Sequence, residues 1–146
     1  MSKSSQPRLR FFAQASSQRH IPTQDQYLYR TPDAKFKIAI IGTGTIGQEH
    51  MRVATLLGRA HVHGIYDLEP HSLDAAQAEY SRYSTRPLRR YASLEQACQD
   101  QEVDALFICT PNFTHFEVLK IAAKSGKPIF VEKPMATTLA DAAEIV

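Results

Sequence analysis

A glycine-rich turn is the first segment whose residue types and spacing point to chemistry. The pattern GxGxxG is formed by Gly42, Gly44 and Gly47. It directly follows the apolar run 37–41 and opens a predicted helix, which is the context of a dinucleotide-binding turn. The first glycine permits the tight turn, the second lets the backbone approach a pyrophosphate, and the third lets helix and strand pack closely. The N–H groups at the helix start, near Thr45 and Ile46, would face the phosphates. The alternative is a tight turn that holds no ligand.

An acidic residue ends the next apolar run. Asp67 lies 20 residues beyond Gly47, which is the spacing of the acid that binds the ribose hydroxyls in this type of site. A carboxylate there accepts hydrogen bonds from the hydroxyls of NAD and repels the 2′-phosphate of NADP. Leu68 follows, and neither neighbour is basic. We therefore expect NAD rather than NADP, while an ordinary acidic residue at a strand end remains the alternative.

Polar residues also follow the fourth predicted strand. They are Thr110, Pro111 and Asn112, with His115 at the start of the next helix. In an open α/β sheet this loop lies at the carboxyl edge, where ligands bind. Its side chains are able to hydrogen-bond a ribose or a nicotinamide, although a turn followed by a helix cap has the same composition.

A lysine follows the fifth predicted strand at the same edge. In Glu132-Lys133-Pro134, Lys133 is placed to hydrogen-bond a substrate hydroxyl and to carry its proton during hydride transfer. Burial would lower the pKa of this lysine and suit it to that task. A surface lysine in a turn is the alternative.

Alternating strands and helices position these residues. Strands are predicted at 37–41, 61–66, 88–91, 103–108 and 129–131. Helices are predicted at 46–57, 72–83, 93–98 and 114–125, and a last one begins near Thr138. Ser72 is a candidate N-cap, and Ser93 and Thr138 each begin a candidate capping box. The alternation predicts an α/β fold with a doubly wound parallel Rossmann sheet of order 3-2-1-4-5, without the sixth strand of the full pattern.

Composition excludes several classes of protein. The 146 residues suit one domain, 43% are hydrophobic, and 17 basic against 15 acidic residues give no argument for nucleic acid. Cys98 and Cys109 form neither a disulfide framework nor a metal-ligand spacing, so we expect no metal and a buried, inert thiol at Cys109. No apolar stretch approaches the roughly 20 residues of a membrane span, and no signal-peptide core follows the N-terminus. We expect a cytoplasmic protein that does not bind membranes.

The first 35 residues differ in composition from the rest. They are rich in Ser, Gln and Arg and carry no acid before Asp25. We interpret residues 1–35 as a flexible N-terminal extension, with some transit-peptide character as the alternative, and residues 36–146 as the NAD(P)-binding Rossmann domain.

The motifs together are more specific than any one of them. The chain from about Lys37 to Val146 resembles the Gfo/Idh/MocA oxidoreductases. The shared residues are Gly42-x-Gly44-x-x-Gly47-x-x-His50, Asp67, Val103-Asp104-Ala105, Thr110-Pro111-Asn112-x-x-His115, Gly126-Lys127-Pro128 and Glu132-Lys133-Pro134. The resemblance gives His50 a regular place in the pattern, which we interpret as a packing position.

The resemblance implies NAD or NADP bound on a Rossmann domain and oxidation or reduction of a sugar, a cyclitol or a related alcohol. It implies that Lys133 touches the substrate and assists proton transfer, and that the Lys133–Pro134 bond is cis. It further implies a C-terminal domain that completes the substrate pocket and tends to make a homo-oligomer interface. That domain is absent here, so we expect this chain to bind cofactor without turnover.

Two other interpretations remain open at this point. One is a stand-alone nucleotide-binding module that acts as a sensor or an interaction partner without catalysis. The other is an enzyme that uses S-adenosylmethionine, because such enzymes share the glycine-rich turn and the acid. The motifs at Thr110 and Lys133 weigh against the latter.

Overall fold

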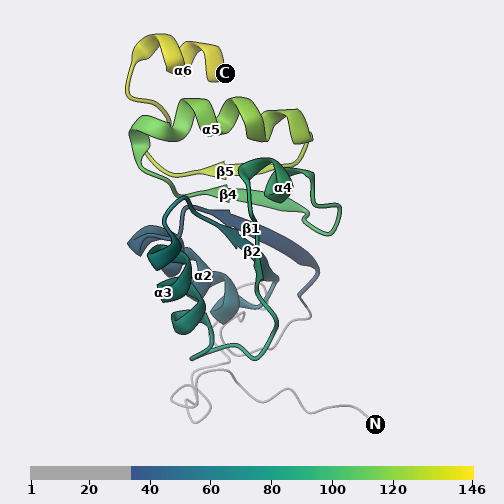
Figure 1. Ribbon diagram of the computed structural model, residues 1–146. Helices are drawn as coiled ribbons and strands as arrows, with labels where there is room; N and C mark the ends of the chain where they lie inside the picture. Colours follow the sequence, from purple (N-terminus) through teal and green to yellow (C-terminus); the bar gives the residue numbers. More distant parts are fainter. Residues whose placement is uncertain (1–33) are drawn as a thin grey trace, which may run out of the picture.

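The computed structural model describes residues 34–146, which form a parallel sheet with helices on both faces (Figure 1). The strands are β1 (Phe36–Ile41), β2 (Ala60–Tyr66), β3 (Arg89–Arg90), β4 (Ala105–Ile108) and β5 (Ile129–Val131). All four pairings are parallel and the order is β3-β2-β1-β4-β5. This confirms the predicted doubly wound sheet.

The central strand β1 is buried between two neighbouring strands. β1 pairs with β2 on one side and with β4 on the other, and its last three residues, Ala39 to Ile41, are fully buried. A strand covered on both faces has to be a continuous apolar run, which is why residues 38–41 are all hydrophobic. The sheet thus separates two apolar cores, one on each face.

Helices from the two halves of the chain cover opposite faces. The elements are α2 (Thr45–Leu57), α3 (Pro70–Tyr80), α4 (Leu94–Gln99), α5 (His115–Ala122) and α6 (Leu139–Ile145). The 3₁₀ turn η3 (Asn112–Thr114) precedes α5, and η4 (Ala123–Ser125) follows it. Helices α2 and α3 lie together on one side, and α4, α5 and α6 lie on the other (Figure 1). Among residues 34–146, no helix is both long and apolar enough to cross a bilayer.

Two predicted caps are confirmed. The Ser93 hydroxyl accepts a hydrogen bond from the N–H of Gln96, and the Thr138 hydroxyl accepts one from the N–H of Asp141. Each cap satisfies a helix N–H that has no partner within the helix.

Some predicted boundaries were wrong. α3 begins at Pro70 with Glu69 as its N-cap, so Ser72 lies within the first turn and is not the cap. Proline suits the first helical position because its fixed φ matches the helix and its missing N–H is not needed there. β4 begins at Ala105 rather than at position 103, because the N–H of Val103 donates to Asp100 in the preceding turn.

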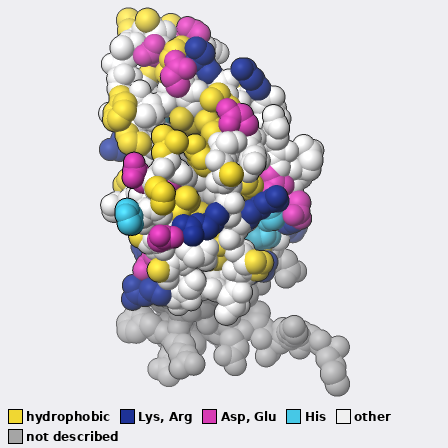
Figure 2. All heavy atoms as spheres, in the orientation of Figure 1, with side chains coloured by type: hydrophobic (Ala, Val, Ile, Leu, Met, Phe, Trp, Pro, Cys, Tyr) yellow, Lys and Arg dark blue, Asp and Glu magenta, His cyan; other side chains and the backbone are white. Residues whose placement is uncertain are grey.

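Apolar side chains also reach the surface of the described part. Figure 2 shows hydrophobic side chains gathered across the middle of one face, with charged side chains among and around them. Strand β5 pairs only with β4 within residues 34–146, and Phe130 on this strand is 42% exposed. This agrees with the expectation that β5 is the outer strand. The interpretation of residues 1–35 as an extension falls almost wholly on residues that the structure does not describe.

Candidate cofactor-binding site

A cleft of about 520 Å³ opens at the carboxyl ends of β1, β2 and β4. Its volume is typical of small-molecule sites, and the strand order reverses at this point of the sheet, where α/β proteins bind ligands. Seven of the eleven predicted cofactor-binding residues line it: Gly42, Gly44, Thr45, Ile46, Asp67, Thr110 and Pro111. Residues from three separate loops, predicted from the sequence, thus lie together in one cleft.

The three glycines occupy three different environments. Gly42 has φ 92°, and a Cβ there would lie 2.6 Å from the amide nitrogen of Thr110. A Cβ on Gly47 would collide with the carbonyl oxygen of Gly42, so this glycine lets α2 pack against the turn. A Cβ on Gly44 would have no atom within 4 Å. Gly44 is thus not required by the fold, and the space beside it is open to a ligand.

Helix α2 points its N-terminus at this open space. Gly44 is the N-cap, no side chain caps the helix, and Gly44, Thr45 and Ile46 all line the cleft. The first N–H groups of a helix and the partial positive charge of its dipole attract anions. The site therefore has the backbone features that bind a phosphate.

Asp67 faces the glycine-rich turn across the cleft. Its Oδ2 accepts hydrogen bonds from the amide and the hydroxyl of Thr43, at 2.6 and 3.0 Å, and its Oδ1 accepts one from the N–H of Glu69 at 2.9 Å. A carboxylate offers about four acceptor positions, so three are in use. One position remains for a ribose hydroxyl, and a second becomes free if the Thr43 hydroxyl turns away.

The loop after β4 divides between the cleft and the interior. Thr110 and Pro111 line the cleft, whereas Asn112 is exposed in η3. The Thr114 hydroxyl donates a hydrogen bond to the Thr110 hydroxyl at 2.8 Å. This contact holds the loop against the start of α5.

His115 lies inside the protein rather than in the cleft. It is 1% exposed, with Nε2 2.9 Å from the carbonyl oxygen of Thr110 and Nδ1 2.9 Å from that of Pro134. Carbonyl oxygens only accept, so a neutral ring donates to one of them and only an imidazolium donates to both. This geometry supports a role in joining the two loops, and direct contact of His115 with the cofactor remains a prediction.

Glu132 is held by a second histidine. Nε2 of His50 donates to Oε1 of Glu132 at 2.6 Å, and this hydrogen bond lowers the pKa of the Glu132 carboxyl. Oε2 of Glu132 accepts from the backbone N–H of Lys133 at 3.2 Å. The His50 ring also contacts Phe130 edge-on, with 5.1 Å between ring centroids. His50 therefore packs as predicted and also orients Glu132, which the sequence did not indicate because the two residues are 82 positions apart.

Lys133 is exposed on the turn that these contacts hold. The peptide bond between Lys133 and Pro134 is cis, as expected from the resemblance. Lys133 does not line the cleft, and within residues 34–146 its ammonium has no partner. The anticipated burial of this lysine is therefore not found in the described part of the chain.

Several lining residues were not predicted. Apolar walls come from Tyr66, Leu68, Leu94 and Val118, and Glu69 and Ser72 lie at the polar rim. In the sequence, Leu68 is recognisable only as a non-basic neighbour of Asp67 and Ser72 only as a candidate N-cap. Cys109 also lines the cleft, and burial raises the pKa of its thiol to about 12. The thiol is therefore protonated near neutral pH, and the burial of Cys109 is as predicted.

Comparisons with known proteins agree with this geometry. Residues 36–146 match the model of the family described as "Oxidoreductase family, NAD-binding Rossmann fold". Inositol 2-dehydrogenase of Paracoccus denitrificans is 37% identical over 111 residues, which are 75% of this chain and 32% of that protein.

Solved structures show the same likeness. The myo-inositol dehydrogenase of Lactobacillus casei, in complex with NAD(H) and myo-inositol, superposes with a TM-score of 0.68 and 30% identity, over 75% of this chain and 32% of that one. An NAD-binding protein of Listeria innocua has a TM-score of 0.66 and 32% identity, over 76% and 31% of the two chains.

The chain belongs to this family of oxidoreductases with an NAD-binding Rossmann fold, the Gfo/Idh/MocA family. It spans about a third of the length of the curated relatives that it matches.

Proposed function

We propose that this chain binds NAD in the cleft at the carboxyl edge and serves a dehydrogenase that acts on a sugar, a cyclitol or a related alcohol. The observation that carries the proposal is the open space beside Gly44, which has the free N-terminus of α2 on one side and Asp67 on the other. The relatives that are named inositol dehydrogenases support the alcohol substrate.

The chain's own residues would divide the cofactor between them. The N–H groups at Thr45 and Ile46 would bind the pyrophosphate, and Asp67 would bind the adenosine ribose. Leu68 and Val118 would form apolar walls for the adenine, and Thr110 would hydrogen-bond the ribose or the nicotinamide on the other side of the pyrophosphate. When bound, NAD supplies the hydride acceptor.

Lys133 would act on the substrate rather than on the cofactor. Its amino group, at the same sheet edge, would hydrogen-bond an alcohol oxygen, taking up the hydroxyl proton as the neutral amine and returning it as the ammonium. His50, through Glu132, and His115, through the Pro134 carbonyl, would hold the turn that carries it. In the whole protein, further residues would close the pocket, and a homo-oligomer is expected.

Cofactor choice follows from the charges at the rim. Asp67 and Glu69 line the cleft, and none of its lining residues within 34–146 is Lys or Arg. A 2′-phosphate would thus meet carboxylates without a compensating cation. We expect NADH to bind at least about tenfold more tightly than NADPH, or about 1.4 kcal/mol.

Titration of the chain with NADH, NADPH and S-adenosylmethionine, followed by fluorescence, tests the proposal. Preferential binding of NADH supports it. Equal or tighter binding of NADPH removes the claim for Asp67, and preference for S-adenosylmethionine would contradict NAD as the cofactor.

A binding module without catalysis is the second candidate. The observation that favours it is the exposed Lys133 ammonium, which has no partner within residues 34–146. A screen of polyols and sugars with NAD decides for the enzyme if it finds turnover. Turnover that is lost in Lys133→Ala would show that this chain is itself an enzyme, and binding without turnover agrees with both candidates for the isolated chain.

A further inference from the structure

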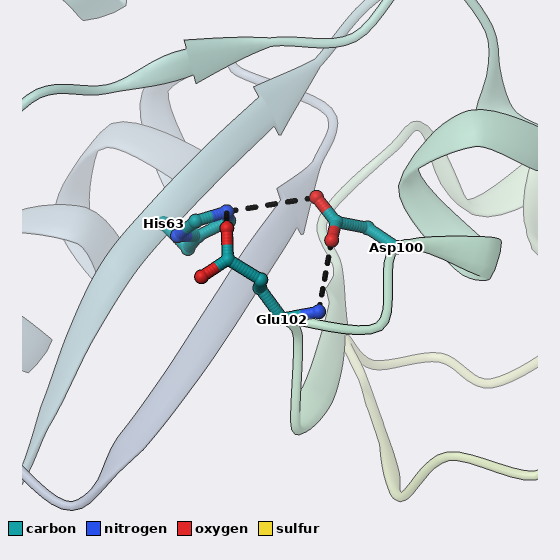
Figure 3. A group of neighbouring side chains, drawn as sticks. All are labelled: His63, Asp100 and Glu102. Atoms are coloured by element: carbon teal, nitrogen blue, oxygen red, sulfur yellow. Dashed lines mark hydrogen bonds and ion pairs between the residues drawn. The ribbon is translucent and has the colours of Figure 1, made fainter.

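Three side chains that the cofactor site does not use meet near the amino ends of the strands (Figure 3). His63 extends from β2, Asp100 follows α4, and Glu102 lies on the turn that leads to β4. One ligand atom from each lies within 4.8 Å of the others. We refer to these three residues as the His63 cluster.

One nitrogen of the His63 imidazole, Nε2, is buried and makes no hydrogen bond within residues 34–146, although it points at two carboxylates. Nε2 lies 3.5 Å from Oδ2 of Asp100 and 3.6 Å from Oε2 of Glu102. Both are too long for good hydrogen bonds. Since buried polar atoms are normally satisfied, this nitrogen calls for an explanation.

The spacing fits ligands around a metal ion. Nitrogen and oxygen ligands lie about 2.1 Å from Zn²⁺, so two ligands of a tetrahedral ion lie roughly 3.4 Å apart. The two distances from His63 are close to that value. We propose that the His63 cluster is a site for a divalent transition-metal ion, with Zn²⁺ as its best probe, in which His63, Asp100 and Glu102 supply three ligands and water supplies the fourth.

The choice of metal follows from the donor atoms. An imidazole with two carboxylates suits zinc and its neighbours, whereas magnesium and calcium prefer oxygen ligands alone. Both carboxyls are ready to bind as anions. Burial would raise the pKa of Asp100, but the N–H of Glu102, the Tyr91 hydroxyl and Arg89 together hold it below its usual value.

Two basic side chains compete with the ion. The Lys37 ammonium lies 2.6 Å from Oε1 of Glu102, which leaves Oε2 facing His63, and it lowers the pKa of Glu102. Arg89 lies 3.0 Å from Oδ2 of Asp100, the same oxygen that faces His63. Their side chains are 35% and 59% exposed, so each is able to swing into water when an ion binds. The site should therefore be modest in affinity, and removal of a competitor should strengthen it.

The site lies away from the cofactor cleft. None of its residues lines that cleft, and they join β2 to the connection between α4 and β4. A bound ion would tie these two segments together and stabilise the amino edge of the sheet. This inference does not depend on NAD binding.

Zinc titration of the full chain tests the proposal. ZnCl₂ is added in a non-chelating buffer with a phosphine reductant, and binding is followed by calorimetry and by competition with a zinc indicator. We expect one ion per chain, with affinity reduced at least about tenfold in His63→Ala and also reduced in Glu102→Gln. Lys37→Met should bind zinc more tightly than the unmodified chain.

Matched controls keep the result specific. His71 is an exposed histidine on α3 and Glu95 is an exposed glutamate on α4, so His71→Ala and Glu95→Gln should bind zinc like the unmodified chain. If His63→Ala does not fold, Glu102→Gln and Lys37→Met decide, because both residues lie at the surface. Absence of binding at millimolar zinc, or affinity unchanged in His63→Ala or Glu102→Gln, would overturn the proposal.

Discussion

Polar residues at the carboxyl edge of this parallel sheet face an open cleft, whereas those at the amino edge pair with one another. At the carboxyl edge, the start of α2 and the Asp67 carboxylate face an open cleft. At the amino edge, charges meet one another, as Lys37 with Glu102 and Arg89 with Asp100. We interpret free hydrogen-bonding groups beside an open cleft as the mark of a ligand-binding edge. Paired charges instead mark an edge whose side chains hold loops together.

His63 departs from this division. On the amino side, Nε2 of His63 and Nδ1 of His61 on the same strand are both buried and make no hydrogen bond within residues 34–146. Burial is the main cause that lowers the pKa of His61, followed by Arg86. The amino edge is thus a structural edge that contains two incompletely satisfied histidine rings, those of His61 and His63.

The largest effect is expected from Gly47→Ala. Because the new Cβ would collide with the Gly42 carbonyl, the turn and α2 must move apart. We expect the free energy of unfolding to fall by about 2 kcal/mol, even though alanine favours a helix by about 1 kcal/mol. Urea denaturation measures this change. A variant as stable as the unmodified chain would show that the turn does not need this close approach.

Gly44→Ala should separate binding from folding. Its Cβ would meet no protein atom, and its φ of −63° is accessible to alanine. We expect a stability loss under about 1 kcal/mol, from the poorer N-cap, and NADH affinity reduced at least about tenfold because the Cβ fills the space meant for the pyrophosphate. Unchanged NADH affinity in a folded variant would contradict the assignment of that space.

Glu132→Gln should produce a smaller, pH-dependent effect. Since His50 lowers the folded-state pKa of Glu132, its contribution is complete above the ordinary carboxyl pKa of about 4.3 and is lost as pH falls through the lowered value. We expect a loss of about 1 kcal/mol at pH 7 that shrinks below about pH 4. Unfolding curves of both proteins from pH 3 to 7 measure it, with Glu117→Gln on the exposed side of α5 as control. A difference independent of pH would remove the role assigned to the pair.

The sequence predicted the parts of this molecule that depend on local chemistry. The glycine-rich turn, the acid at Asp67 and the bounds of β5 follow from residue types and spacing over short stretches, and the structure agrees for the turn and the strand. The confirmed caps at Ser93 and Thr138 are of the same kind, because each is a contact across three residues.

Contacts between segments far apart in the sequence could not be predicted from residue types and spacing. The link from His50 to Glu132 and the position of His115 between Thr110 and Pro134 depend on how the loops meet. The His63 cluster joins β2 to a turn almost 40 positions later, so no spacing rule indicated it. Lys133 follows β5, as the sequence predicted, but its exposure depends on segments distant in sequence, and its role in the reaction stays a prediction.

The central claim is that a dinucleotide binds at the carboxyl edge and not at the amino edge. The most direct test is an amide NMR titration of the ¹⁵N-labelled chain with NADH. We predict that the largest shifts occur at Gly44, Thr45, Asp67 and Thr110, while His63 and Glu102 stay unchanged. Shifts centred on His63 and Glu102, or none in the glycine-rich turn at saturating NADH, would contradict the account.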